Sequence, residues 1–122
     1  MIPDFSLEDQ FENLNLKGAS LSGLDLTGKS FTNCSFERAD LSGARLEEAR
    51  FDHCKFMQAQ LNDVVLDNAS LDYCNFSSSA YNRISAKGAM LTGCLFESAH
   101  IEDCLFEQAT FDYCDFERAV FK

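Results

Sequence analysis

The cysteines are the side chains whose spacing most suggests chemistry, because five of the six recur at one fixed interval. Twenty residues separate each of these five from the next, and Cys104 lies midway between the last two: Cys34, Cys54, Cys74, Cys94 and Cys114. Zinc sites usually bring paired cysteines two to four residues apart, and no such pair occurs, so we expect no metal site. The thiols are instead expected to be free, small apolar side chains, as is typical of proteins in a reducing compartment such as the cytoplasm.

Ionisable side chains are the second candidate for chemistry. Asp and Glu number 20 against 10 Lys and Arg, giving a net charge of −10. This balance argues against direct binding to nucleic acid and favours a basic partner. His53 and His100 have no nucleophile pattern near them, and the carboxylates are scattered. We therefore assign no catalytic residue and no cofactor, and predict that the protein is not an enzyme.

The elements that hold these residues follow a period of five. From Phe11 to Phe121, nearly every fifth residue is Phe, Leu or another large apolar residue. Two residues earlier stand all six cysteines and most of the alanines; two residues later stand all six glycines. Steps of five would spread apolar side chains around an α-helix and would alternate faces along a strand. A short extended side followed by a bend fits the spacing, since Gly and Asn accept the positive φ of a type II turn.

The number of bends in one lap follows from the cysteine interval. Twenty residues contain four five-residue units, so we predict a four-sided coil in which each residue stacks on the one twenty positions earlier. Stacked strands lie about 4.8 Å apart. Cysteines and phenylalanines would then form columns inside one wall, and the interior would have no room for a substrate.

Individual repeats resemble a known family. Ala39-Asp40-Leu41-Ser42-Gly43, Cys34-Ser35-Phe36-Glu37-Arg38 and Ala69-Ser70-Leu71-Asp72-Tyr73 are similar to the pentapeptide-repeat pattern A(D/N)LXX. The resemblance implies an all-β fold, a right-handed quadrilateral parallel β-helix. We expect residues 11–122 to form this β-helix and residues 1–10 to be a cap or lead-in over the first coil, with Phe5 and Leu7 as its apolar contacts.

A few positions depart from the repeat. Lys29 stands where alanine belongs, and it is expected to extend toward solvent, with pairing to Asp9 as the alternative. Ile84 and Ala86 exchange the usual sizes, which we interpret as repacking at constant volume. Ser79 and Tyr81 bring hydroxyls inward, where they could bond each other. The stretch 77–87 is therefore the best candidate for a bulge or a recognition site, although a neutral variant coil is the simpler interpretation.

Outward charges are sorted unevenly among the walls, and two adjacent walls carry most of the acid excess. Like charges on stacked strands are mildly unfavourable, so fold stability does not require them. We therefore predict a partner-binding surface, with a solubilising role as the alternative. Its residues are the stacked acids of both walls and two neighbouring tyrosines: Glu47, Asp52, Asp67, Asp72, Tyr73, Glu107, Asp112 and Tyr113.

Two functions remain open. The first is a rigid protein–protein interaction module whose partner is unidentified. The second is implied by the resemblance: some family members mimic DNA and bind DNA gyrase or topoisomerase IV, conferring fluoroquinolone resistance. The residues near Met1 show no signal-peptide pattern and no apolar run is long enough for a membrane span. We expect a cytoplasmic protein, with a secreted effector as an open alternative. An apolar last coil at Phe121 predicts a homodimer through that end or a longer parent chain.

Overall fold

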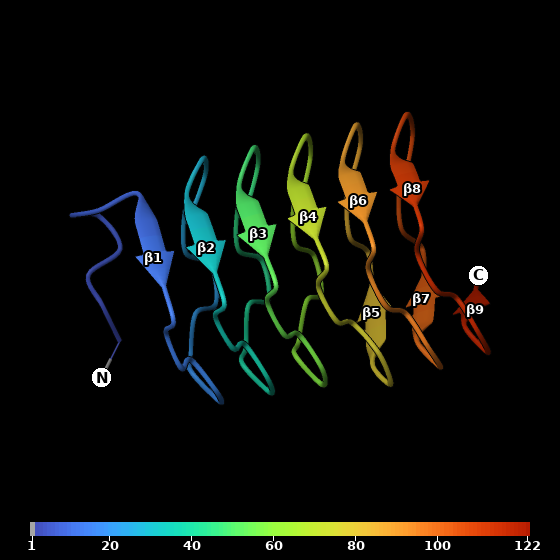
Figure 1. Cartoon of the computed structure of the whole chain (residues 1–122), viewed down its shortest axis with the longest axis horizontal. Coiled ribbons are helices and arrows are strands. Elements are labelled where there is room, and N and C mark those ends of the chain that lie inside the picture. The colour runs from blue at the N-terminus through green and yellow to red at the C-terminus, as the bar shows by residue number, and fades with distance from the viewer. Residues whose placement is uncertain (1) are drawn as a thin grey trace.

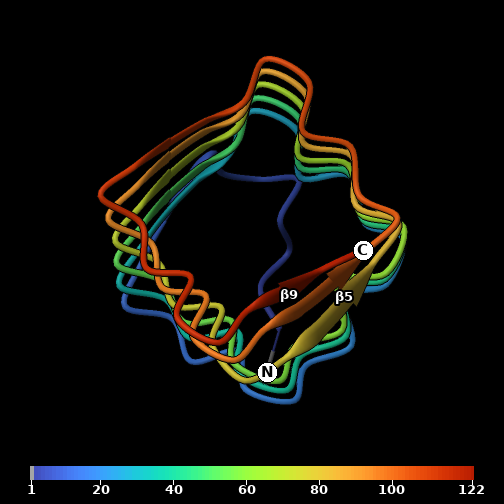
Figure 2. The ribbon, with the colours of Figure 1, turned by 90° about the vertical axis from the view of Figure 1, so that its right-hand side faces the viewer.

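The chain forms a right-handed quadrilateral parallel β-helix of about six laps, described here for residues 2–122 of a computed structural model. Figure 1 shows the laps side by side along the rod, and Figure 2 shows them superimposed down its axis. Within residues 2–122, no helix has the length and apolar character that crossing a bilayer requires. The strands are β1 (Gln10–Glu12), β2 (Ser30–Thr32), β3 (Arg50–Asp52), β4 (Ser70–Asp72), β5 (Ala80–Asn82), β6 (Met90–Thr92), β7 (His100–Glu102), β8 (Thr110–Asp112) and β9 (Val120–Phe121).

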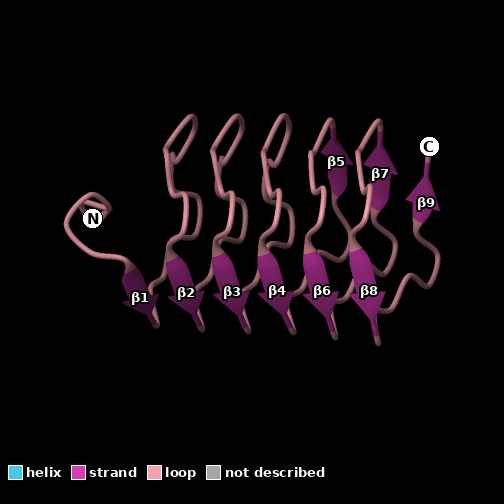
Figure 3. Ribbon diagram, turned by 90° about the horizontal axis from the view of Figure 1, so that it is seen from above, coloured by secondary structure: helices cyan, strands magenta, loops and turns pink. Residues whose placement is uncertain are grey.

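Each residue pairs with the residue twenty positions along the chain, which confirms the predicted lap. Phe11 lies opposite Phe31, which lies opposite Phe51, and the same register continues along the parallel sheet β1-β2-β3-β4-β6-β8. A second parallel sheet, β5-β7-β9, lies on another wall of the rod (Figure 3). Single parallel bridges complete the walls, for example Ser35 with Lys55 and Arg45 with Val65. Strands are short because every five-residue unit ends in a bend.

The bends fall where the sequence predicts them. From Asn13 to Arg118, every fifth residue has a φ between 53° and 73°, the left-handed region that glycine and asparagine accept most easily. Many corners are closed by a hydrogen bond three residues back, as in the type II turn from Leu41 to Ala44, where the Ala44 N–H donates to the Leu41 carbonyl at 2.9 Å. The corners that follow the six-stranded sheet lack this bond and leave their third residue projecting outward.

Apolar side chains fill the coil because each wall has room for one large and one small side chain. Phe36, Phe56, Phe76, Phe96 and Phe116 stack nearly parallel, with ring centroids 4.8 to 5.0 Å apart. The neighbouring phenylalanine column meets them edge to face, as at Phe51 and Phe56. Stacked rings along one column and crossed rings between columns are both favourable aromatic geometries.

All six cysteines are free, as predicted. Four are buried, whereas Cys104 and Cys114, near the last lap, are half-buried. In the five-membered column each thiol donates to a backbone carbonyl of the lap below at 3.3 to 3.7 Å, so the S–H groups are satisfied inside the wall. For Cys74, the contacts with the Cys54 and Cys94 thiols, and then burial, raise the pKa above its ordinary value.

The lead-in covers the first lap only in part. Phe5 is buried and packs edge-on against Phe11 at 5.1 Å, as predicted for a lid residue. Leu7 is 78% exposed, so its predicted contact is wrong. Lys29 follows the alternative prediction: its Nζ binds the Asp9 carboxylate at 3.1 Å and the Glu8 carbonyl at 3.0 Å instead of extending free into solvent. Met1, part of the predicted lead-in, lies outside the described residues.

The stretch 77–87 keeps the twenty-residue register but interrupts the ladder on one wall. There the Ser79 hydroxyl accepts from the Gln58 N–H and donates to the Ser77 carbonyl, taking the place of a direct backbone bond. Tyr81 donates to the backbone carbonyls of Phe56 and Phe76, and its phenol also lies beside the Ser79 hydroxyl, so the two inward hydroxyls belong to one cluster.

The size exchange at Ile84 and Ala86 is accommodated, and a small cavity remains beside it. Both side chains are buried, and an apolar cavity of about 30 Å³ remains among the neighbouring side chains, which include Leu66, Leu91 and Phe106. Ile84 and Ala86 both line this space, which the small alanine side chain on the axis leaves unfilled. At the last lap the apolar column opens to solvent, and Phe121 is half exposed.

Candidate interaction surface

Of the eight residues predicted as a partner-binding surface, the six acids lie in two columns on adjacent walls, and the two tyrosines lie in a third column at a corner. Asp52, Asp72 and Asp112 end strands β3, β4 and β8 of the six-stranded sheet, where Asp52 and Asp72 are direct neighbours in the register. In this column Thr92 stands between Asp72 and Asp112. Glu47, Asp67 and Glu107 form the other column, in which Lys87 takes the place between Asp67 and Glu107. Both acidic columns are therefore interrupted in the same lap.

The second column is largely occupied by bonds within the chain. Glu47 accepts two hydrogen bonds from the Arg45 guanidinium, at 3.0 and 3.3 Å. Asp67 accepts from the Ser85 hydroxyl at 2.7 Å and from the Lys87 backbone N–H at 3.0 Å. Exposed ion pairs add little stability, but they cancel charge locally. This column is thus a weaker site for a cationic partner than its composition suggests.

The first column keeps more of its charge free. Asp52 lies 2.6 Å from Nδ1 of His53. Asp72 and Asp112 have no side-chain hydrogen bond or ion pair to any residue from 2 to 122. A shallow groove of about 270 Å³ runs along the outer face of β1 to β4 and includes Asp52 and Asp72 in its lining. The outer edge of the six-stranded sheet is therefore an open, acidic surface.

Aromatic side chains project from the corner next to this column. The His53 and Tyr73 rings stack with centroids 5.1 Å apart and an angle of 23° between their planes. The Tyr73 ring also lies against Gly93, the corner residue one lap further. Tyr113, another lap on, is 94% exposed. Exposed tyrosine is a common anchor at interfaces because it offers a large, rigid contact area with few torsions to fix.

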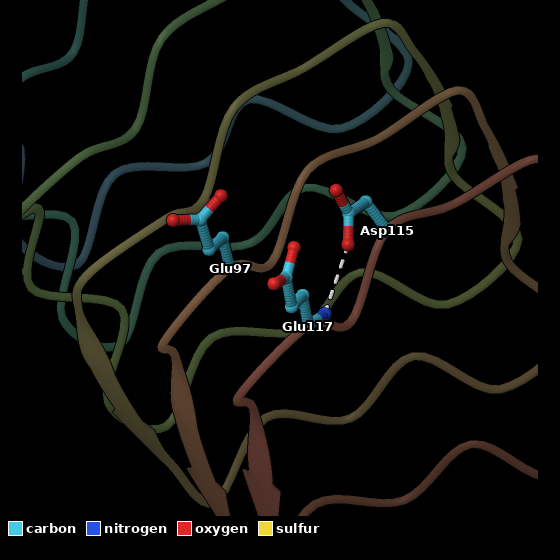
Figure 4. Close-up of side chains that lie close together, drawn as sticks. All are labelled: Glu97, Asp115 and Glu117. Carbon is cyan, nitrogen blue, oxygen red and sulfur yellow. Dashed lines mark hydrogen bonds between the residues drawn. The ribbon is translucent and has the colours of Figure 1, made fainter.

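A separate cluster of acids lies on the wall of the cysteine column. Oxygen atoms of Glu97, Asp115 and Glu117 lie within 4.8 Å of one another (Figure 4). Arg118 bonds both glutamates, at 2.6 Å to Glu97 and 3.1 Å to Glu117, and Asp115 accepts the Glu117 N–H at 2.9 Å. The arginine compensates the cluster, which makes it a poor place for a cation.

Another pair links two laps. Arg83 donates to both oxygens of Asp63, twenty residues away, at 2.7 and 3.0 Å. The hydrogen bonds from the Arg83 guanidinium hold the pKa of the Asp63 carboxyl below its ordinary value. Arginines thus pair with acids on three walls, whereas Asp72 and Asp112 on the six-stranded sheet have no such partner in the described part of the chain.

Sequence reasoning missed three residues of this surface: His53, Thr92 and Gly93. The signal was present, since writing the sequence in rows of twenty places His53, Tyr73, Gly93 and Tyr113 in one column. His53 is given no role by the sequence pattern, but in the structure it is exposed and stacks on Tyr73.

Comparison with known sequences identifies the repeat. The family described as a pentapeptide repeat region matches residues 29–103, and the pentapeptide repeats family matches residues 89–122. No curated protein sequence matches the chain.

Solved structures share the architecture. One is a trypsin-treated variant of QnrB1, a plasmid-mediated fluoroquinolone resistance protein, with a TM-score of 0.68 and 21% identity over 92% of this chain and 70% of that one. A pentapeptide repeat protein from Nostoc, alr5209, has a TM-score of 0.59 and 21% identity over 96% and 88% of the two chains. Rfr23 from the cyanobacterium Cyanothece has a TM-score of 0.51 and 17% identity over 97% and 95%. At these identities the likeness concerns the fold alone.

Proposed function

The chain belongs to the pentapeptide-repeat family, and from that premise we propose that it is a non-catalytic rod that binds a protein partner through its outer surface. The observation that carries the proposal is the unpaired acid of the six-stranded wall beside exposed aromatic rings. Unpaired carboxylates beside exposed tyrosines are typical of a protein–protein interface.

The interior supports a binding role over a catalytic one. Large side chains close the axis of every lap, and the apolar cavity beside Ala86 has a volume of only about 30 Å³. Small-molecule sites commonly measure ~300–1,000 Å³ and enclose most of the ligand. The groove along β1 to β4 approaches this volume but is shallow and open, a shape better suited to another protein surface.

The partner should carry positive charge where it meets this wall, because the chain has a net charge of −10. Complementary charge raises the association rate and excludes wrong partners more than it adds affinity. We therefore expect binding that weakens as salt increases, because exposed charges are screened over about 8 Å at physiological ionic strength.

The test is partner capture by the intact chain and by two variants of equal charge. One variant replaces Asp52, Asp72 and Asp112 with asparagine; the control replaces Glu37, Glu102 and Asp103 with the matching amides. A partner retained by the wild type and the control, but lost with the first variant, is the expected result. Equal capture of the partner by the wild type and both variants would contradict the proposal.

Mimicry of duplex DNA is a second candidate, favoured by the acid excess on a rod whose fold is that of QnrB1. The partner would then be a DNA-binding enzyme such as DNA gyrase or topoisomerase IV. A supercoiling assay with purified gyrase separates the two functions. Inhibition at micromolar protein that excess DNA relieves would support mimicry, whereas unchanged supercoiling would remove it.

A further inference from the structure

The cysteine column places free thiols in consecutive laps, and the binding of a protein partner makes no use of them. Cys94 and Cys114 are the pair nearest the open last lap, and both thiols are free. The parallel bridge between Leu95 and Asp115 fixes the two cysteines in register, one lap apart. Cys94 is buried, whereas Cys114 is half-buried. An ion from solvent therefore reaches this pair of the column at Cys114.

The distance between the two sulfur atoms follows from the repeated orientation of the thiols. Every Sγ of the column contacts the carbonyl two residues earlier and the carbonyl 23 residues earlier, at 3.3 to 3.7 Å. Side chains with the same contacts have the same orientation, so neighbouring sulfurs are separated by one lap. The Phe96 and Phe116 rings, two residues further along each lap, are 5.0 Å apart. The sulfurs of Cys94 and Cys114 are therefore also about 5 Å apart.

This separation suits a metal ion between the sulfurs better than a disulfide bond. The sulfurs of a disulfide are only about 2 Å apart, so one thiol would have to leave the orientation that the whole column shares. A bond from a thiolate to a soft metal is about 2.3 Å long, and a linear sulfur–metal–sulfur bridge therefore spans about 4.6 Å. A small rotation of both thiols about their Cα–Cβ bonds provides that span.

The number of thiols and the apolar wall select the kind of ion. Within residues 2–122, no three thiols lie close enough together to hold one ion, so zinc, which takes four ligands in a tetrahedron, does not fit. Soft ions that accept two thiolates in a line do fit, and these are the cuprous, silver and mercuric ions. Cys94 belongs to the apolar core and Cys114 packs against it. A divalent ion between two thiolates leaves no net charge there, which favours mercuric ion because burying a charge is costly.

We propose that Cys94 and Cys114 bind one soft, two-coordinate metal ion between their sulfur atoms, and that mercuric ion is the preferred one. On binding, both S–H bonds break, two metal–sulfur bonds form and two protons pass to solvent, while the oxidation states of sulfur and metal stay unchanged. The thiols need not be ionised beforehand, because the ion displaces their protons. The site lies inside the wall of the cysteine column and goes beyond the proposed function, on which it does not depend.

The experiment titrates the full chain with mercuric chloride in an excess of the monothiol 2-mercaptoethanol, and native mass spectrometry counts the ions that are retained. The wild type should keep one ion and lose two protons, because two thiols of one site act as a chelate. Cys94→Ala and Cys114→Ala should each lower the affinity about tenfold or more. Alanine is the commonest residue at this position of the repeat, so both variants should fold.

Cys104→Ala is the matched control. Cys104 is half-buried like Cys114, but Ile84 stands one lap below it and donates its backbone N–H to the Cys104 sulfur at 3.4 Å. A single thiol forms no chelate, so the control should retain the ion as the wild type does. Equal retention by the wild type and all three variants, loss of the ion from Cys104→Ala, or no retention by the wild type would overturn the assignment.

A second measurement uses the unmodified sequence and so does not depend on the folding of a variant. The wild type is treated with iodoacetamide before and after one equivalent of mercuric chloride, and the modified peptides are identified by mass spectrometry. Bound metal should slow the alkylation of Cys114 about tenfold or more and leave that of Cys104 unchanged. Equal protection of both cysteines, or protection of neither, would overturn the assignment.

Discussion

Single side chains in the interior are sorted by size because each wall of a lap holds one large and one small residue. Ile84 and Ala86 reverse this order and leave an apolar cavity of about 30 Å³. The phenol hydroxyl of Tyr81 is satisfied in the interior by the backbone carbonyls of Phe56 and Phe76. Both features make predictions that concern one or two residues.

Restoring the usual size order should stabilise the rod. The double variant Ile84→Ala/Ala86→Leu keeps the total number of carbon atoms and moves the large side chain onto the axis, where the cavity lies. We expect a gain of about 1 kcal/mol in the free energy of unfolding, measured in urea, because an unfilled methyl-sized space costs about that much. The reverse exchange in a regular lap, Ala44→Ile/Leu46→Ala, is the control and should destabilise. A loss of stability in both would contradict this account of the cavity.

Stability at high pH should depend on Tyr81. Burial raises the pKa of its phenol above the ordinary value of 10.0. The unfolded chain therefore loses this proton at a lower pH than the folded chain does. The neutral phenol's contribution to the free energy of unfolding is complete below pH 10. It falls by about 1.4 kcal/mol per pH unit as the pH rises above 10. Unfolding in urea from pH 8 to 11 should show this decline in the wild type, and Tyr81→Phe should reduce it. An unchanged pH profile in the variant would contradict the assignment.

At the scale of the element, a five-residue unit consists of one short side and one corner. The side contributes a ring or aliphatic group to a column, and the corner places one residue at positive φ. Neither part is stable alone, because three-residue strands gain their hydrogen bonds and contacts only from the laps above and below. Substitutions should therefore act through the column or corner to which they belong.

The position of a residue in its column should set the cost of removing it. Phe56 stacks on Phe36 at 4.9 Å and on Phe76 at 4.8 Å, whereas Phe116 is half-buried and stacks on Phe96. Phe56→Ala should cost about 3–5 kcal/mol, and Phe116→Ala markedly less. Urea unfolding of both variants checks this. Similar costs for the two variants would show that the position of a ring in its column does not decide its contribution to stability.

Corner substitutions should depend on backbone conformation more than on space. Gly43 has φ of 70° and open space where a Cβ atom would lie. Asparagine should be tolerated there, whereas threonine should cost about 1–2 kcal/mol because left-handed backbone disfavours a branched side chain. Thermal unfolding of Gly43→Asn and Gly43→Thr distinguishes them. Equal melting temperatures would show that the corner relaxes away from positive φ.

At the scale of the whole molecule, the rod has a closed middle and a more open last lap. Cysteines report this gradient, because four are buried and two, Cys104 and Cys114, are half-buried. Burial raises the pKa of both half-buried thiols above the ordinary value. The fraction of reactive thiolate is therefore low at neutral pH even where the sulfur is accessible.

Thiol labelling should follow the same gradient. Iodoacetamide should modify Cys104 and Cys114 first, faster as pH rises, while the other four react only on unfolding. Mass spectrometry of peptides from a time course gives the order, and labelling in urea supplies the fully reactive control. Early modification of Cys54 or Cys74 would show that the middle laps open.

Sequence alone determined the lap of twenty residues, the inward registers, the positive-φ corners and the free cysteines. These features can be predicted because the same residue sizes and backbone preferences recur in every lap of the sequence. Tertiary structure decided which acids stay free, because Arg45 and Ser85 reach Glu47 and Asp67 only through particular rotamers. It also decided that Ser79 replaces a backbone bond and that the Tyr73 ring lies over Gly93. Such contacts depend on where a side chain points, and a periodic pattern specifies the position of a side chain but not its direction on the surface.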